Sequence, residues 1–188
     1  EIMSGSEILI EADTAELLYN KQLLTINETD YLLLETYLNY LPLYFENIIY
    51  DIKALGYQII IAHPERYSYI QKDYKKIYSW IKDFDVKLML NSSSLLGRHG
   101  IRAKKTAENL LKLGLYHLMG SDTHKYNKRS FSLDQGLEKA ESLKSESSQF
   151  FKDNARLVVE NKPLNSMEIK KAKALLIDKF FSFIKEGG

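Results

Sequence analysis

Carboxylate and imidazole side chains stand at the downstream ends of short apolar runs in this 188-residue chain. Glu35 ends one run, His63 ends a second, and Asp122 and His124 follow a third. In α/β barrels the active site lies at the carboxyl ends of the strands. The pattern therefore predicts one rim of a metal-dependent hydrolase barrel.

Each of these residues also has a purely structural interpretation. Taken alone, His63 is more typical of a hydrogen-bonded core histidine, and Asp122-x-His124 could be a capped turn. Because Pro64 disfavours helix at the residue before it, we expect His63 to be extended at its strand end. Carboxylate and imidazole donors suit Mn, Fe or Zn, so their presence at two strand ends together favours a metal site.

Two glutamates and two arginines extend this constellation. An unpaired carboxylate beside an apolar run is costly to desolvate. Glu35 lies at the end of its run, which favours a metal role, whereas Glu7 opens its run, which favours a salt bridge. Arg66 and Arg129 each follow a candidate ligand histidine, and a guanidinium presents a fork of donors that matches phosphate oxygens. Together with metals, these arginines indicate a phosphoester substrate.

The elements that must position these residues alternate along the chain. We predict strands at 7–10, 23–26, 31–34, 57–62, 86–90 and 115–120, and helices at 13–18, 44–55, 73–84, 101–113, 132–145, 149–159 and 166–185. Alternation of this kind predicts an α/β fold with a mainly parallel sheet. No linker or internal repeat divides the chain, so we expect one domain over residues 1–188. His117, inside a predicted strand, is interpreted as structural.

Composition excludes several classes of function. With 26 basic and 25 acidic residues, the chain has no charge excess that would favour a nucleic-acid partner. The absence of cysteine excludes disulfides, thiol nucleophiles and thiolate metal sites. No apolar run approaches the roughly 20 residues that span a bilayer, and we expect a cytoplasmic protein without membrane insertion. The chain opens with Glu1, and a full α/β barrel takes about 250 residues, so we expect an amino-terminal portion to be missing.

Four motifs in combination resemble one protein group. They are Ile-Ala-His-Pro-Glu-Arg-Tyr at 61–67, Leu-Asn-Ser-Ser-Ser-Leu-Leu-Gly at 90–97, Ala-Lys-Lys-Thr-Ala-Glu at 103–108 and Gly-Ser-Asp-Thr-His at 120–124. The chain is similar to the bacterial protein-tyrosine phosphatases of capsular and exopolysaccharide loci, within the polymerase-and-histidinol-phosphatase (PHP) hydrolases. The likeness extends over about residues 5–129, and residues 154–164 resemble the closing segment of these enzymes.

The resemblance implies a distorted PHP-type β/α barrel, mainly of parallel strands with outer helices, and up to three divalent metal ions, often manganese. Water activated by the metals attacks the phosphorus of phosphotyrosine, without a cysteinyl-phosphate intermediate. The implied metal ligands are Glu7, Glu35, His63, Asp122 and His124, and the implied phosphate-binding catalytic residues are Arg66 and Arg129. The implied substrate is the phosphotyrosine-bearing tail of an autokinase that regulates polysaccharide synthesis.

One departure from the group leaves alternatives open. The similar proteins open with a His-x-His strand that carries further ligands, and no such motif occurs in this chain. Its absence should weaken the metal cluster, because divalent sites need several donors. The alternatives are a PHP-type phosphoesterase for a small phosphorylated metabolite and a catalytically dead, metal-poor interaction domain.

Overall fold

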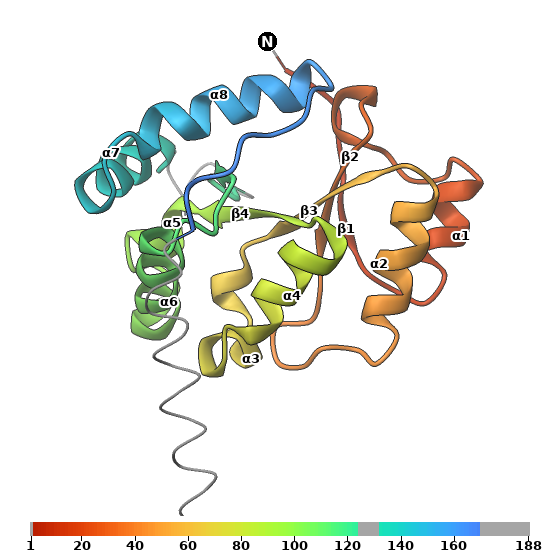
Figure 1. Cartoon of the computed structure of the whole chain (residues 1–188), viewed down its shortest axis with the longest axis horizontal. Helices are drawn as coiled ribbons and strands as arrows, with labels where there is room; N and C mark the ends of the chain where they lie inside the picture. Colours follow the sequence, from red (N-terminus) through yellow and green to blue (C-terminus); the bar gives the residue numbers. More distant parts are fainter. Residues whose placement is uncertain (1, 124–131, 170–188) are drawn as a thin grey trace, which may run out of the picture.

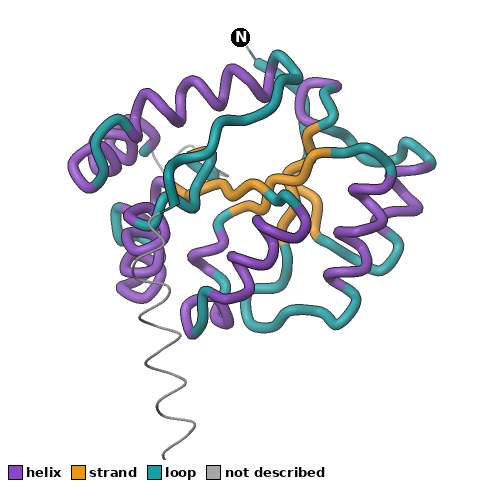
Figure 2. Tube along the Cα trace, in the orientation of Figure 1, coloured by secondary structure: helices purple, strands orange, loops and turns teal. Residues whose placement is uncertain are grey.

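A computed structural model describes residues 2–123 and 132–169 of the chain. At its centre, five strands form one sheet in the order β1-β2-β3-β4-β5, and every neighbouring pair is parallel (Figures 1 and 2). The strands are β1 (Glu7–Leu9), β2 (Tyr31–Glu35), β3 (Gln58–Ala62), β4 (Lys87–Asn91) and β5 (Leu118–Gly120). The predicted α/β class and parallel sheet are confirmed.

Helices connect the strands and continue after them. They are α1 (Thr14–Tyr19), α2 (Phe45–Ala54), α3 (Ser68–Lys72), α4 (Lys75–Phe84), α5 (Ser92–Leu95), α6 (Gly100–Lys112), α7 (Leu133–Leu143) and α8 (Ser147–Val159), with 3-10 turns η1 (Ile26–Glu28) and η2 (Pro64–Arg66). Among the described residues, no helix is both long and apolar enough to cross a lipid bilayer.

The two faces of the sheet differ in what covers them. Because each new strand adds on the same side and parallel crossovers are right-handed, the connecting helices lie on one face. There the larger core cluster joins Leu32, Leu34, Ile59, Ile61, Leu88 and Leu90 to Phe45, Ile49, Ile77, Trp80, Leu110 and Leu111 of α2, α4 and α6. Alternate strand residues point the other way. On that opposite face a smaller cluster packs Tyr31, Ile60 and Leu118 against Val158 of α8 and Leu164.

Four segments differ from the prediction. The predicted strand at 23–26 is wrong: none of these residues pairs with the sheet, both edges of β2 are occupied by β1 and β3, and η1 begins at Ile26. The helices α3 and α5 were not predicted, and α5 forms where Asn91 caps a run of serines by accepting a hydrogen bond from Ser93 N at 2.8 Å. Residues 166–169 of the helix predicted at 166–185 are not helical, and the remainder lies outside the described residues.

The sheet carries β1 and β5 at its edges in the part of the chain that the structure describes. Parallel strands with outer helices therefore agree with the barrel-type architecture expected from the sequence. The carboxyl ends of all the strands meet at one edge of this sheet, as the parallel pairing requires.

Candidate metal centre

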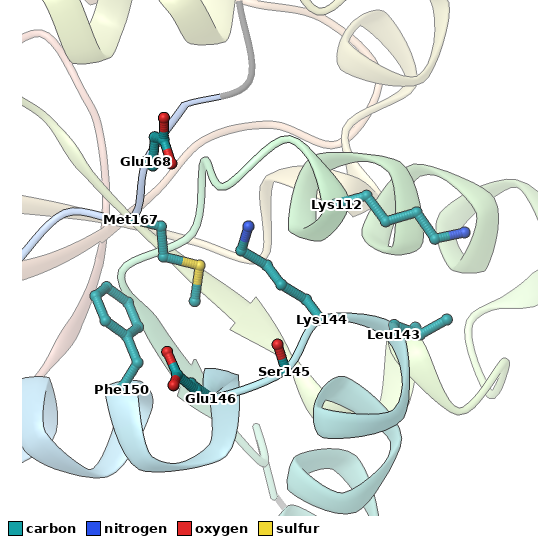
Figure 3. A pocket seen from close by; sticks show the side chains of 8 residues that line it. All are labelled: Lys112, Leu143, Lys144, Ser145, Glu146, Phe150, Met167 and Glu168. Atoms are coloured by element: carbon teal, nitrogen blue, oxygen red, sulfur yellow. The ribbon is translucent and has the colours of Figure 1, made fainter.

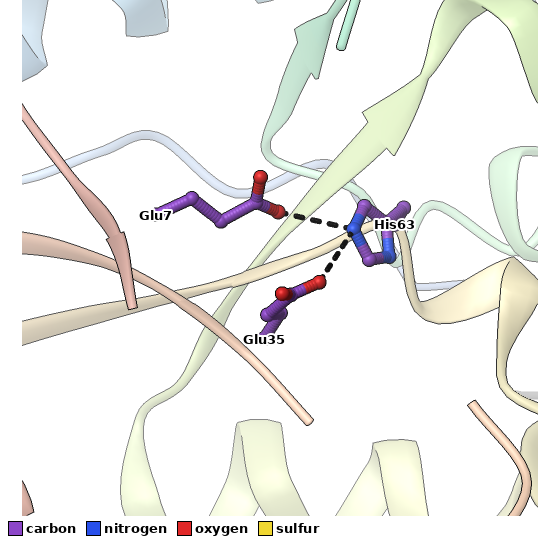
Figure 4. Close-up of side chains that lie close together, drawn as sticks. All are labelled: Glu7, Glu35 and His63. Atoms are coloured by element: carbon purple, nitrogen blue, oxygen red, sulfur yellow. Dashed lines mark ion pairs between the residues drawn. The ribbon is translucent and has the colours of Figure 1, made fainter. Parts of the chain in front are cut away.

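Three side chains from neighbouring strands converge on the face opposite the helices of the larger cluster. His63 Nε2 lies 3.0 Å from Glu7 Oε1 and 3.3 Å from Glu35 Oε2 (Figure 4). One ligand atom from each residue lies within 4.8 Å of the other two. We call Glu7, Glu35 and His63 the triad.

The strand register explains why the two glutamates meet. Glu7 is paired with Leu33, and Leu9 with Glu35, so both carboxylates belong to the same row of alternating side chains. Leu33 packs against the smaller core cluster, which identifies the face. A carboxylate at the start of β1 thereby reaches one at the end of β2.

His63 reaches this face only because its backbone leaves the extended conformation. An extended residue 63 would share the helix-covered face with Ile59 and Ile61. Instead His63 adopts φ 34° and ψ 51°, the left-handed region. The prediction of an extended His63 is therefore wrong, although its N–H still donates to Met89 O at 2.9 Å. Such conformations are uncommon outside glycine and concentrate at functional sites.

The triad shifts the pKa values of His63 and Glu35 in opposite directions. Burial lowers the pKa of His63, but hydrogen bonds to Glu35 and Glu7 outweigh burial and raise this pKa to about 9. The hydrogen bond from His63 also lowers the pKa of Glu35, against the effect of burial. A pKa of this size favours an imidazolium at neutral pH, with Nε2 facing both carboxylates.

The donor set fits a divalent cation. One imidazole nitrogen and two carboxylate oxygens are the ligand types that Mn, Fe and Zn accept. Ligation requires a neutral histidine, so a cation would replace the proton that His63 shares with Glu7 and Glu35. His63 Nδ1 is buried without a hydrogen-bond partner among the described residues.

A second group lies beside the triad. Asp122 Oδ2 accepts hydrogen bonds from Arg66 Nη1 at 3.1 Å and from Asn91 Nδ2 at 2.8 Å. Arg66 and Asp122 also act electrostatically on the pKa of Glu35, Arg66 lowering it and Asp122 raising it, after the larger effects named above. The structure therefore brings together Glu7, Glu35, His63, Arg66 and Asp122. Of the other predicted site residues, His124 and Arg129 lie outside the described residues.

Two buried residues of this region had no role assigned from the sequence. In the sequence, Asn91 and Glu65 stand out only as parts of the motifs at 90–97 and 61–67. Glu65 is fully buried; its carboxylate accepts from Asn91 N at 3.1 Å and from Tyr116 O–H at 2.9 Å, and burial raises its pKa. A charged residue between a histidine and an arginine gives no sequence signal of burial, which depends on the packing of β4 and the chain before β5.

A separate cleft of about 570 Å³ lies at the far end of α6, where the chain between α7 and α8 meets residues 167–168 (Figure 3). Lys112, Lys144, Glu146 and Glu168 are among its lining residues. Cations and anions alternate there, so the cleft favours no single class of ligand.

Comparison with known proteins identifies the family. Residues 1–160 match the sequence profile of the family described as capsular polysaccharide synthesis, CpsB/CapC. The chain belongs to the CpsB/CapC family. Tyrosine-protein phosphatase YwqE of Bacillus subtilis (strain 168) is 30% identical over 164 residues, which cover 87% of this chain and 64% of YwqE. Putative tyrosine-protein phosphatase CapC of Staphylococcus aureus is 32% identical over 163 residues, which cover 86% of this chain and 63% of CapC.

A solved structure confirms the CpsB/CapC fold. It comes from work described as crystal structures of YwqE from Bacillus subtilis and CpsB from Streptococcus pneumoniae, unique metal-dependent tyrosine phosphatases. The TM-score is 0.82 at 29% sequence identity, covering 88% of this chain and 67% of the solved one. By the sequence alignments, the chain spans less than two thirds of the length of YwqE and of CapC.

Proposed function

We propose that this protein is a metal-dependent protein-tyrosine phosphatase. Its proposed substrate is phosphotyrosine on an autokinase that regulates capsular or exopolysaccharide synthesis. The observation that carries the proposal is the convergence of Glu7, Glu35 and His63 at 3.0 and 3.3 Å in a chain of the CpsB/CapC family. The names of the relatives, which are tyrosine-protein phosphatases, support the same activity. A PHP-type single domain over residues 1–188 and a cytoplasmic location complete the proposal.

The triad would hold one divalent cation, with Asp122 and His124 as further ligands of the site. When bound, Mn²⁺, or Fe or Zn in its place, supplies Lewis-acid polarisation of a phosphoryl oxygen and lowers the pKa of water. Glu7 and Glu35 provide the negative charge that favours a cation here. The left-handed backbone of His63 presents its imidazole to both carboxylates.

Arg66 would bind the phosphoryl group. Its guanidinium has five donors in a planar fork, and the Nη1 bond to Asp122 holds that fork at the edge of the triad. A fixed cation at this position stabilises negative charge as it develops on the transferring group. Arg129 is proposed to act in the same way. Residues 1–188 contain no cysteine, so none of them supplies a thiol nucleophile.

Phosphate release from a phosphotyrosyl peptide tests this proposal on the full-length protein. We expect Mn²⁺-dependent release that falls by at least about 100-fold in His63→Ala and in Asp122→Ala. Glu138→Ala, which removes an exposed carboxylate of α7, is the control and should keep its activity. Release that needs no metal, or that persists in both site variants, would contradict the proposal.

Substrate comparison separates tyrosine phosphatase from metabolite phosphoesterase. We expect kcat/KM for the phosphotyrosyl peptide to exceed that for a phosphoseryl peptide or a sugar phosphate by about tenfold or more, or about 1.4 kcal/mol in transition-state binding. A preference for the sugar phosphate would support the small-metabolite alternative instead.

A further inference from the structure

Glu65 lies at the middle of η2, between His63 and Arg66, and no part of it is exposed. A buried carboxyl is costly unless hydrogen bonds satisfy it. Glu65 Oε1 accepts from Asn91 N at 3.1 Å, and Glu65 Oε2 accepts from Tyr116 O–H at 2.9 Å. Both partners are themselves fully buried. Glu65 therefore links η2 to the last residue of β4 and to the chain that enters β5.

Asn91 connects Glu65 to the site residue Asp122. Its side-chain amide nitrogen donates to Asp122 Oδ2 at 2.8 Å, and its side-chain oxygen accepts from Ser93 N at 2.8 Å. Since both ends of the amide are engaged, the backbone of Asn91 decides where the amide points. Glu65 accepts the N–H of that backbone, which is also held by the pairing of Asn91 with Gly120 in β5.

Arg66 closes the arrangement from the other side. It follows Glu65 directly in η2 and donates to the same Asp122 Oδ2 at 3.1 Å. A shift of Glu65 relative to β4 would move Arg66 Nη1 away from Asn91 Nδ2, the two donors that bond to Asp122 Oδ2. The Glu65 carboxyl thus helps to set the distance between Asn91 and Arg66, beside the backbone bond from His63 N to Met89 O.

We propose that Glu65 is a positioning residue that, through Asn91, holds the Asp122 carboxylate and the Arg66 guanidinium in their working geometry. The inference rests on the proposed function in assigning cation and phosphate binding to Asp122 and Arg66. Glu65 itself touches neither member of this pair in any contact described above. Its role is to set the position of groups that do bind.

The side-chain amide resonance of Asn91, measured by nitrogen-15 NMR in the metal-free chain, tests the positioning directly. The resonance is assigned by its loss in Asn91→Ala. Glu65→Ala should move it, because Asn91 N loses its acceptor, whereas Glu65→Gln should leave it in place, because glutamine can bond both partners. Ile52→Ala, a core truncation in α2, is the control for general loosening and should not move it.

Mn²⁺ affinity, measured by calorimetry on the same variants, gives a second readout. Loss of an outer-shell hydrogen-bond partner commonly lowers metal affinity 10- to 100-fold, so we expect a fall of about that size in Glu65→Ala and a change within about threefold in Glu65→Gln. If Glu65→Ala does not fold, Glu65→Met/Tyr116→Phe removes the acceptor while replacing both polar partners with apolar groups of similar shape.

The inference is overturned if the Asn91 resonance is unmoved in a folded Glu65 variant that lacks the acceptor, or if Ile52→Ala moves it as much. A wild-type chain that binds no Mn²⁺ would count against the proposed function. In that case the Asn91 resonance would still decide the role of Glu65.

Discussion

At residue 63 a left-handed backbone and a shared proton act on the same side chain. The backbone turns the imidazole to the face where Glu7 and Glu35 lie, and the two carboxylates then raise its pKa to about 9. Glu7 shows why sequence position alone was ambiguous. Its place at the start of β1 favoured a salt bridge, the family resemblance favoured a metal ligand, and the ion pair it makes joins it to the predicted ligand His63.

Glycine is usually less stable than alanine at a given position, but the left-handed conformation at His63 predicts the opposite order for His63→Gly and His63→Ala. His63→Ala and His63→Gly both lose the imidazole, but glycine tolerates positive φ at little cost, so His63→Gly should be more stable by about 1 kcal/mol. Urea unfolding of the metal-free chains measures the difference. As a control, Ala62→Gly in extended β3 should be less stable than wild type. An alanine variant as stable as the glycine variant would refute the strained backbone.

His117 predicts a dependence of stability on pH. Burial, helped by Lys87 and opposed by Asp85, lowers its pKa to about 4, whereas an unfolded histidine titrates near 6.5. Between these values the unfolded chain binds more protons, so the free energy of unfolding should fall as pH decreases from about 6.5 to 4, by on the order of 3 kcal/mol. This loss is absent above about pH 7.

His117→Asn is the comparison for that measurement. An asparagine oxygen can replace Nδ1 as the acceptor for Leu88 N, which lies 3.2 Å away, without binding a proton. Urea unfolding from pH 7 to pH 4 should therefore show a shallower acid-side decline in the variant. Equal slopes in the two proteins would mean that His117 titrates normally in the folded state.

At the scale of elements, periodicity predicted what depends on local sequence. The apolar runs of β2 and β3 and the helix α2 were found within one or two residues, because a buried parallel strand and an amphipathic helix are evident from their own side chains. The strand predicted at 115–120 shortens to Leu118–Gly120, where the His117 ring accepts the Leu88 N–H. The prediction of a strand at 23–26 was wrong because a strand forms only where a neighbouring strand has a free edge to pair with, which local sequence does not reveal.

The contact between α5 and α7 predicts a steric effect at Gly136. A Cβ at this glycine would lie 2.5 Å from Ser92 Cβ, and neither helix backbone can yield without moving its neighbours. Gly136→Ala should therefore lower the free energy of unfolding by about 1–3 kcal/mol, despite the higher helix propensity of alanine. Glu138→Ala, on the exposed side of α7, is the control and should change stability by less than about 0.5 kcal/mol. A stabilised Gly136→Ala would show that α5 and α7 are not in close contact.

At the scale of the whole molecule, the larger hydrophobic core and the candidate metal site lie on opposite faces of the sheet. Helices α2, α4 and α6 and the larger core cover one face, and the triad lies on the other, at the rim where the strand ends meet. The rim could be predicted from the sequence because polar residues follow the apolar runs of a parallel sheet. The buried hydrogen bonds of Glu65 and Asn91 could not be predicted from the sequence. They join elements that are far apart in the chain, and neither segment alone determines how closely the two elements pack.

A cation that binds only the folded chain must stabilise it. At a Mn²⁺ concentration of 100 times the dissociation constant, the gain should be about 2.7 kcal/mol. Thermal unfolding with and without Mn²⁺ measures it, and Glu35→Gln, which keeps the size of the side chain but removes its charge, should lose most of the gain. An equal gain in the variant would place the cation elsewhere.

The central claim is that Glu7, Glu35 and His63 hold a divalent cation, and elemental analysis tests it most directly. The 188-residue chain and its His63→Ala variant would be loaded with Mn²⁺, dialysed extensively and compared for bound metal. We predict about one or more Mn²⁺ per wild-type chain and a clear loss in a folded His63→Ala. Equal metal in both chains, or none in the wild type, would contradict the account.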